Sequence, residues 1–169
     1  SFTNIGGQVR NRLAALSEST GQALAWDAGI RGRSTLAVSA LAVLGNTLYV
    51  GGVGTTSVGG QSRTNLYAVS LSDALPTTWN PPTLRTTSAG SVNTLAVDGD
   101  TIILGGDFTS VAGQSRTNLA AVSATDTGTV ESWSPNPNGV VYAVAVRDGV
   151  AYAGGTFTSI GTVLRNPEL

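Results

Sequence analysis

One six-residue motif recurs every 53 residues along this chain of 169 residues, and this repetition constrains the fold more than any other feature. Two copies read Gln-Ser-Arg-Thr-Asn-Leu and begin at Gln61 and Gln114, and a looser copy begins at Gln8. The chain therefore consists of about three repeats. The motif residues that we single out as candidate functional or structural positions are Gln8 and Arg10, then Gln61, Arg63 and Asn65, then Gln114, Arg116 and Asn118.

Two further markers recur with a similar period of about 53 residues. One is a tryptophan near the end of each repeat, at Trp26, Trp79 and Trp133. The other is a pair of adjacent glycines, at Gly51-Gly52, Gly105-Gly106 and Gly154-Gly155.

Each repeat contains short apolar runs separated by turn sequences, which is typical of β-structure. In the third repeat, the runs at 95–97 and 102–104 flank Asp98-Gly99, a dipeptide that favours a two-residue hairpin turn. A third run begins at the leucine of the motif, and a fourth short stretch ends at the tryptophan. We call these four expected strands A, B, C and D. No segment shows the 3.6-residue apolar stripe of an amphipathic helix.

Four short strands in a repeat of this length are typical of a β-propeller blade. We therefore predict an all-β fold made of four-stranded antiparallel blades, with about three blades present in a single propeller segment, 1–169. The expected units are a half blade (C and D) in 1–33, complete blades in 34–89 and 90–138, and a half blade (A and B) in 139–169.

Three blades are too few to close a ring, because propellers close with about four to eight. Two explanations remain open. The chain is a segment of a longer propeller of six to eight blades, or copies assemble and two of them complete each other's half blades in a six-bladed ring.

The glycine pairs and the tryptophans have structural explanations. We expect each glycine pair where strand B meets crowded backbone or a bulge, because a phosphate-binding loop would need a helix N-terminus after it. Each tryptophan is expected to pack between adjacent blades. The alternative for the tryptophans is an exposed aromatic platform that stacks on sugar rings.

The arginine of the motif recurs as Arg10, Arg63 and Arg116 in a loop that follows strand B. A guanidinium group in each blade can donate to backbone carbonyls or pair with a carboxylate, which would tie blade to blade. The alternative is a ring of guanidinium groups presented to an anionic ligand such as an acidic polysaccharide.

Composition excludes several classes of function. The chain has no Lys, His or Cys, so it lacks a thiol nucleophile, a Ser–His pair, a zinc finger and a Schiff-base lysine. We therefore predict no cofactor and no metal site. A net charge of −1 argues against nucleic-acid binding, and no apolar run is long enough to span a membrane.

The carboxylates do not form a recognisable catalytic or calcium-binding pattern. Asp98 and Asp100 flank a glycine, but the pair does not recur in the other repeats, and hairpin-turn chemistry explains them better than a calcium loop. Asp107 and Glu131 are the candidates for a glycosidase acid–base pair, on no stronger ground than that both are carboxylates.

The run 105–122, Gly-Gly-Asp-Phe-Thr-Ser-Val-Ala-Gly-Gln-Ser-Arg-Thr-Asn-Leu-Ala-Ala-Val, resembles the delta-sixty-type and Kelch-like β-propeller repeats of large secreted or surface proteins of bacteria. The resemblance implies a propeller and an extracellular setting, and it implies no activity. A looser resemblance to quinoprotein dehydrogenase repeats rests on Thr-Gly turns before Trp26 and Trp133, and no cofactor is carried over from it.

The expected function is a non-catalytic propeller module of a secreted or cell-surface bacterial protein, which acts as a scaffold or as a platform for protein or glycan ligands. The remaining blades, from the same chain or a second copy, are its expected partners. The alternative is a polysaccharide-active enzyme, a glycosidase or lyase, that uses carboxylate, Tyr and Arg side chains. Tyr49, Tyr142 and Tyr152 would be its nucleophile or base candidates, although their strand positions favour a place in the core.

Overall fold

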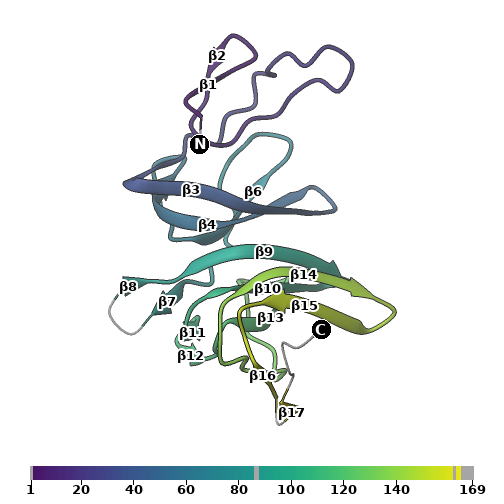
Figure 1. The fold of residues 1–169 in the computed structure, drawn as a ribbon. Helices are drawn as coiled ribbons and strands as arrows, with labels where there is room; N and C mark the ends of the chain where they lie inside the picture. The colour runs from purple at the N-terminus through teal and green to yellow at the C-terminus, as the bar shows by residue number, and fades with distance from the viewer. Residues whose placement is uncertain (1, 86–87, 162, 165–169) are drawn as a thin grey trace.

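The computed structural model describes residues 2–85, 88–161 and 163–164, and all regular structure in these residues is β-strand (Figure 1). No helix occurs in these ranges, and the described residues therefore contain no helix long and apolar enough to cross a membrane. The strands form small antiparallel sheets that follow one another along the chain. The prediction of an all-β fold is confirmed.

The second repeat forms an antiparallel meander. Strands A, B and C are β3 (Arg31–Leu44), β4 (Thr47–Val58) and β6 (Leu66–Ser70), and β4 pairs with both of the others. The short β5 (Gln61–Ser62) folds back on the end of β4. Gly45 adopts a φ of 56° in the turn between β3 and β4, where a two-residue hairpin needs positive φ.

The third repeat has the same order. Strand B, β10, lies between strands A and C, which are β9 and β13. A second sheet of four short strands runs in the order β12, β11, β7, β8 beside this meander. The bounds are β7 (Thr83–Arg85), β8 (Ser88–Ala89), β9 (Ser91–Asp98), β10 (Thr101–Asp107), β11 (Ser110–Val111), β12 (Gln114–Ser115) and β13 (Leu119–Ser123).

Both ends of the chain form partial repeats. At the start, the hairpin of β1 (Asn4–Ile5) and β2 (Gln8–Val9) precedes a segment that occupies the place of strands C and D. At the other end, strands A and B are β14 (Val141–Arg147) and β15 (Val150–Gly155), and β16 (Ser159–Ile160) pairs with β17 (Val163–Leu164).

Strand D is shorter than the sequence predicts. In the second repeat it makes one isolated bridge, Val69 with Pro76, and the Thr77 N–H donates to the Ala68 carbonyl at 3.0 Å. Pro76 has no N–H to donate, which limits the pairing of this outer segment. The equivalent bridges in the first and third repeats are Leu16 with Ala23 and Val122 with Val130.

The strands also divide the chain slightly differently from the expected boundaries at 33/34 and 89/90. Strand β3 already begins at Arg31 and pairs there with the end of β4. Strand β7 pairs with β11 of the third repeat and with β8, so residues 83–85 and 88–89 belong to the unit that was predicted to begin at residue 90. The cause is the short hairpin that lies between strands B and C, formed by β11 and β12 in the third repeat. Its first strand also pairs with the segment that precedes strand A, which is β7. Residues 162 and 165–169 of the last expected unit lie outside the described residues.

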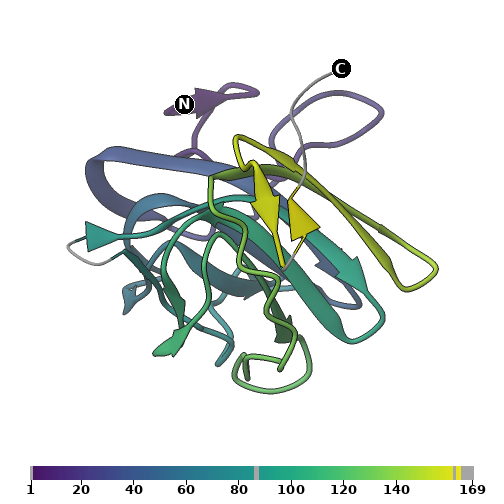
Figure 2. The ribbon, with the colours of Figure 1, turned by 60° about the horizontal axis from the view of Figure 1, so that its bottom comes forward.

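The A strands lie beside one another, as in a propeller. Strand β9 contacts β3 on one side and β14 on the other (Figures 1 and 2). Each B strand faces the A strand of the following repeat, because β4 contacts β9 and β10 contacts β14. The repeats are therefore successive wedges around one axis, and the fold is a partial β-propeller.

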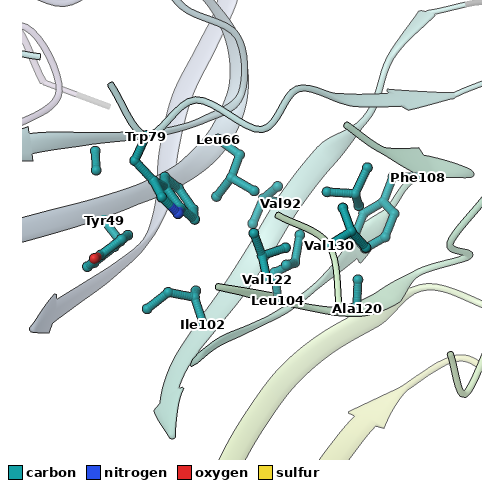
Figure 3. Packing of buried hydrophobic residues seen from close by; sticks show 12 residues of the cluster. Tyr49, Leu66, Trp79, Val92, Ile102, Leu104, Phe108, Ala120, Val122 and Val130 are labelled. Atoms are coloured by element: carbon teal, nitrogen blue, oxygen red, sulfur yellow. The ribbon is translucent and has the colours of Figure 1, made fainter. Parts of the chain in front are cut away.

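The apolar cores lie between successive repeats. The core between the second and third repeats brings Tyr49 and Trp79 against Val92, Ile102 and Leu104 (Figure 3). A second core joins the first partial repeat to the second, and a third joins β10 and β13 to β14 and β15. Burial of apolar surface therefore links each wedge to the next.

Candidate functional site: the junctions between repeats

The first glycine of each pair makes room for a valine of the following repeat. A Cβ atom on Gly51 would lie 2.6 Å from Cγ1 of Val92, and one on Gly105 would lie 2.5 Å from Cγ1 of Val141. Both valines are fully buried. A side chain at either glycine would therefore push the wedges apart. Gly154, the third member of this set, has only the Cβ of Ala143 nearby, at 4.0 Å.

The second glycine of each pair serves the strand pairing inside its own repeat. A Cβ on Gly52, Gly106 or Gly155 would overlap a carbonyl oxygen of the neighbouring A strand. The register between strands A and B shifts close to each of these glycines, which is the signature of a β-bulge. The structure thus places a bulge and a close backbone approach at the glycine pairs.

The valines that pack against these glycines were not among the residues predicted from the sequence to have a role. Val92 and Val141 each stand 14 residues before the second glycine of their own repeat, and Val38 holds the same position in the second repeat. The spacing was visible in the sequence. The contact could not be predicted from that spacing, because each valine packs against the glycine of the preceding repeat and not against the glycine of its own repeat.

The tryptophans connect successive repeats through their indole N–H groups. Trp26 donates to the carbonyl of Ser70 at 3.2 Å, and Trp79 donates to the carbonyl of Ser123 at 2.7 Å. Trp79 is only 2% exposed, and its ring packs edge-on against Tyr49 with 4.8 Å between centroids. Trp133 is 38% exposed. Trp26 is partly buried, so the sugar-platform alternative is best supported at Trp133.

The motif arginines tie the loop between strands B and C to the outer segment of their own repeat. Arg63 donates through Nη2 to the carbonyl of Thr77 at 2.6 Å, and Arg116 donates to that of Glu131 at 2.6 Å. Arg10 makes the equivalent bond to Leu24 at 2.6 Å. These contacts stay within one repeat, whereas the sequence analysis expected ties between blades. The same Nη2 groups of Arg63 and Arg116 also donate to Oε1 of Gln61 and Gln114.

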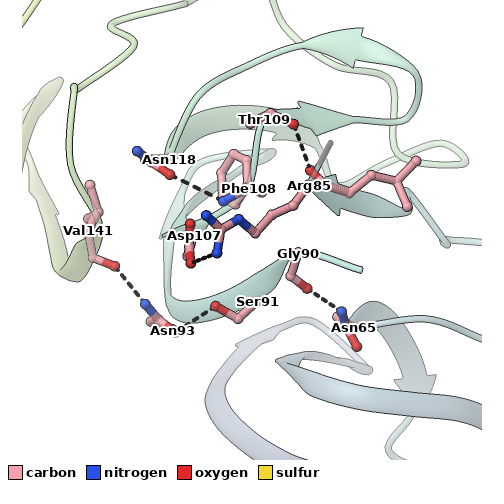
Figure 4. A network of polar contacts seen from close by, with 11 residues as sticks. Asn65, Arg85, Gly90, Ser91, Asn93, Asp107, Phe108, Thr109, Asn118 and Val141 are labelled. Carbon is pink, nitrogen blue, oxygen red and sulfur yellow. Dashed lines mark hydrogen bonds and ion pairs between the residues drawn. The ribbon is translucent and has the colours of Figure 1, made fainter. Parts of the chain in front are cut away.

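This arrangement does not present the guanidinium groups as an anion-binding ring. Arg10 and Arg63 are buried, and each spends two or more donors on backbone carbonyls. The asparagine two residues after the motif arginine makes the hydrogen bond that links one repeat to the next. Asn65 donates to the carbonyl of Gly90 (Figure 4), and Asn118 donates to that of Pro137 at 3.2 Å.

The carboxylates are dispersed over the molecule. Asp107 forms an ion pair with Arg85 at 2.7 Å (Figure 4), whereas Glu131 lines a different part of the surface, near Ile103. Ile103 and Asp107 are four residues apart on β10, which separates them by about 13 Å along the strand. The carboxyl groups of a glycosidase lie about 5–9.5 Å apart, so this placement does not favour Asp107 and Glu131 as an acid–base pair.

Turn geometry accounts for the carboxylates with shifted pKa values. Asp126 accepts hydrogen bonds from the backbone of Gly128 and Thr129 at 2.7 and 2.9 Å. Interactions with the side chain and backbone of Thr129, and then with Gly128, lower its pKa from the ordinary 3.8 to about 2. Hydrogen bonding, led by the backbone of Leu75, also lowers the pKa of Asp73. Within the described ranges, no three His, Cys, Asp or Glu side chains gather as a metal site would require.

The tyrosine candidates differ in environment. Tyr49 is buried, and its hydroxyl donates to the carbonyl of Ala124 at 2.9 Å. Burial, with a smaller contribution from Asp100, raises its pKa. Tyr142 and Tyr152 are 58% and 61% exposed, so their expected place in the core is wrong. They lie on β14 and β15, where no following repeat covers the sheet in the described structure.

The exposed Trp133 borders a cleft of about 560 Å³. The cleft lies between the third repeat and the β14–β15 hairpin, and Asp98 and Glu131 also line it. It combines an aromatic face with two carboxylates and the apolar Val150 and Ile103. Such a combination of apolar and polar groups is what a binding site offers, so this cleft is our candidate binding site.

Comparison with known proteins adds one match. Residues 100–120 match a family model described as a β-propeller domain of unknown function (DUF5122). The match runs from the start of β10 through the third motif, and it supports a β-propeller repeat family. This chain contains a propeller repeat. No curated protein and no solved structure matches the chain.

Proposed function

We propose that the chain is a non-catalytic β-propeller module that acts as a scaffold or as a binding platform for protein or glycan ligands. The observation that carries this proposal is the use of the repeated side chains. Apart from Gly154 and Trp133, the glycines, tryptophans and arginines that recur about every 53 residues contact neighbouring strands and carbonyls of the chain itself. These repeated positions therefore either hold a wedge together internally or join it to the next wedge.

The surface between these repeated positions varies from repeat to repeat, as expected of a platform whose framework is fixed. The cleft beside Trp133 is the place on the described surface where a ligand with an apolar face and polar edges fits best. Sugar rings have both features, and they stack on aromatic side chains. The catalytic alternative has weaker support, because Asp107 lies far from Glu131 and Tyr49 already donates its hydroxyl proton to a carbonyl.

We place this module in a secreted or cell-surface protein of bacteria. The support is the resemblance of the 105–122 run to such repeats, together with the absence of cysteine from the sequence. Immunodetection of the native protein in secreted, envelope and cytosolic fractions tests this placement. Recovery in the cytosolic fraction alone would contradict it.

A glycan panel tests the functional proposal when binding and turnover are measured separately. We expect no release of reducing ends or unsaturated products from any polysaccharide, whether or not binding is detected by calorimetry. Turnover that disappears in Glu131→Gln but persists in the surface control Asp148→Asn would show that the protein is an enzyme. Binding that disappears in Trp133→Ala without turnover would assign the platform to the cleft.

A further inference from the structure

The sheet formed by β14 and β15 has one face that no part of the described chain covers. We call this the open face, and it consists of Ala143, Ala145, Val150, Tyr152 and Gly154, all of which are exposed. The opposite face of the same sheet carries Val141, Val144 and Val146, which pack against the third repeat. In the second repeat, the face equivalent to the open face is covered by the third repeat.

The other side of such a junction is exposed at the opposite end of the molecule. Leu95 and Val97 of β9 pack against the core that contains Tyr49, and they represent the surface that a following repeat contributes. The equivalent residues of β3, Leu41 and Val43, are 51% and 55% exposed. Strand β3 therefore presents the surface that the open face lacks.

Two backbone edges are complementary in the same way. Strand β15 pairs with β14 on one edge, and no described strand takes the place on its other edge that β6 takes beside β4. The segment 13–17 occupies the place of strand C. In the described structure it pairs only with the outer segment, through Ala15 and Ser17 with Leu24 and Gln22. An unpaired strand edge is a template for another chain.

We propose that the open face binds a second copy of this chain, whose segment 13–17 adds to β15 as strand C and whose β3 packs on the open face. The two complete repeats fix the geometry. Within them, strand B pairs with strand C so that Gly51 lies opposite Leu66 and Gly105 opposite Leu119, which gives Gly154 opposite Leu13 of the second copy. Likewise, Val38 of the second copy takes the vacant space at Gly154, as Val92 does at Gly51.

The same register accounts for two of the three exposed aromatic residues, Trp133 and Tyr152. Each of the other two indoles donates to the serine that ends strand C of the next repeat, 44 residues on, and for Trp133 the equivalent serine is Ser17 of the second copy. The cleft beside Trp133 is then the seat of the incoming strand. Tyr152 stands where Tyr49 stands in the second repeat, so it meets Trp26 of the second copy as Tyr49 meets Trp79.

For two copies of residues 1–169, two such junctions related by a twofold axis would close a ring. These residues contain two complete blades and two halves, so two copies give six blades, within the range of closed propellers. The hairpins β1–β2 and β16–β17 are equivalent elements, because both follow a Phe-Thr dipeptide. Each completed blade brings one hairpin from each copy together, and one of them takes the place that the end of β4 and β5 holds in the second repeat.

Sedimentation equilibrium of the 169-residue chain tests this assembly. We expect twice the single-chain mass of 17.0 kDa at roughly 100 μM and a shift toward 17.0 kDa on roughly hundredfold dilution. The variant Gly154→Val fills the space for Val38 of the second copy, and it has room in the single chain. We expect it to remain folded by circular dichroism and to sediment as a single chain at every concentration.

A variant on the other half of the junction keeps the test independent of that glycine. Leu41→Ser is expected to raise the dissociation constant at least tenfold, whereas Leu75→Ser, an equally exposed leucine on an outer segment, is expected to leave it unchanged. A single chain at roughly 100 μM overturns the proposal. So does a dimer that survives both Gly154→Val and Leu41→Ser, and so does a glycan that binds at Trp133 without dissociating the dimer. A glycan at Trp133 and the incoming strand would occupy the same cleft, so the third outcome distinguishes between the two uses of that cleft. The mass of the chain and of its variants tests the assembly alone, whether or not a glycan binds.

Discussion

At the scale of single residues, the junctions depend on the absence of a side chain. Gly51 leaves space for the buried Val92, so a methyl group there must displace packed atoms. We expect Gly51→Ala to lower the free energy of unfolding by about 1–3 kcal/mol, measured by urea denaturation. The control is Gly45→Asn in the turn of the same sheet, where nothing lies near and Asn tolerates positive φ. Equal losses in the two variants would contradict this account.

The planar fork of Arg63 holds the loop between strands B and C. A lysine at this position keeps the charge but cannot reach the carbonyls of Ser62 and Thr77 together with the amide of Gln61. We expect Arg63→Lys to cost about 1–3 kcal/mol of unfolding free energy. Arg147→Lys, at an exposed pair with Asp148, should change it by less than about 0.5 kcal/mol. An unchanged stability in Arg63→Lys, with loss of binding to an acidic polysaccharide, would favour the anion-binding alternative.

The turn carboxylate Asp126 gives the chain an acid-sensitive element. Its pKa of about 2 lies below the ordinary 3.8, so the folded state favours the ionised form. This stabilisation is present above pH 3.8 and is lost as the pH falls toward 2. We expect the urea midpoint of Asp126→Asn to fall less steeply over this interval than that of the parent chain. The variant Asp148→Asn should follow the parent curve, and a matching slope in Asp126→Asn would contradict the assignment.

At the scale of elements, the inner strands and the outer segment differ in how they are held. Strand β10 has paired neighbours on both edges and is largely buried, whereas the outer segment of the third repeat makes one isolated bridge. In hydrogen exchange, we expect the amides of Ile102, Ile103 and Leu104 to be protected the longest. The amide of Glu131 should exchange much earlier, although it is bonded to Ala121 at 2.9 Å. Comparable protection would show that the outer segment is a full strand.

The elements also show how far the sequence could lead. Periodicity located strands A, B and C and the glycine pairs, because each recurs with its neighbours in the same chain. It overestimated strand D, which makes a single isolated bridge in each of three repeats, whether the residue at the bridge is Ala23, Pro76 or Val130. It also placed Tyr142 and Tyr152 in the core, because a repeat pattern does not show whether a following repeat is present to cover them.

The hydrogen-bond partners of the motif side chains were the feature that could least be predicted from the sequence. The arginine motif predicted bonds to carbonyls but not that the carbonyls of Thr77 and Glu131 belong to the same repeat. Donor and acceptor are 14 or 15 residues apart, and both contacts within a blade and contacts between blades satisfy such a spacing. Only the register of the sheets decides between them.

At the scale of the whole molecule, the wedges are coupled through their shared cores, and the proposed assembly extends that coupling across two chains. Unfolding of a dimer releases two chains, so its apparent stability depends on concentration. Between roughly 1 and 100 μM, we expect the free energy of unfolding to rise by RT ln 100, about 2.7 kcal/mol, with a matching shift in the thermal midpoint. Gly154→Val should unfold at one temperature throughout this range, because its second copy cannot seat Val38. A midpoint that does not move in the parent chain would mean that the open face stays uncovered in solution.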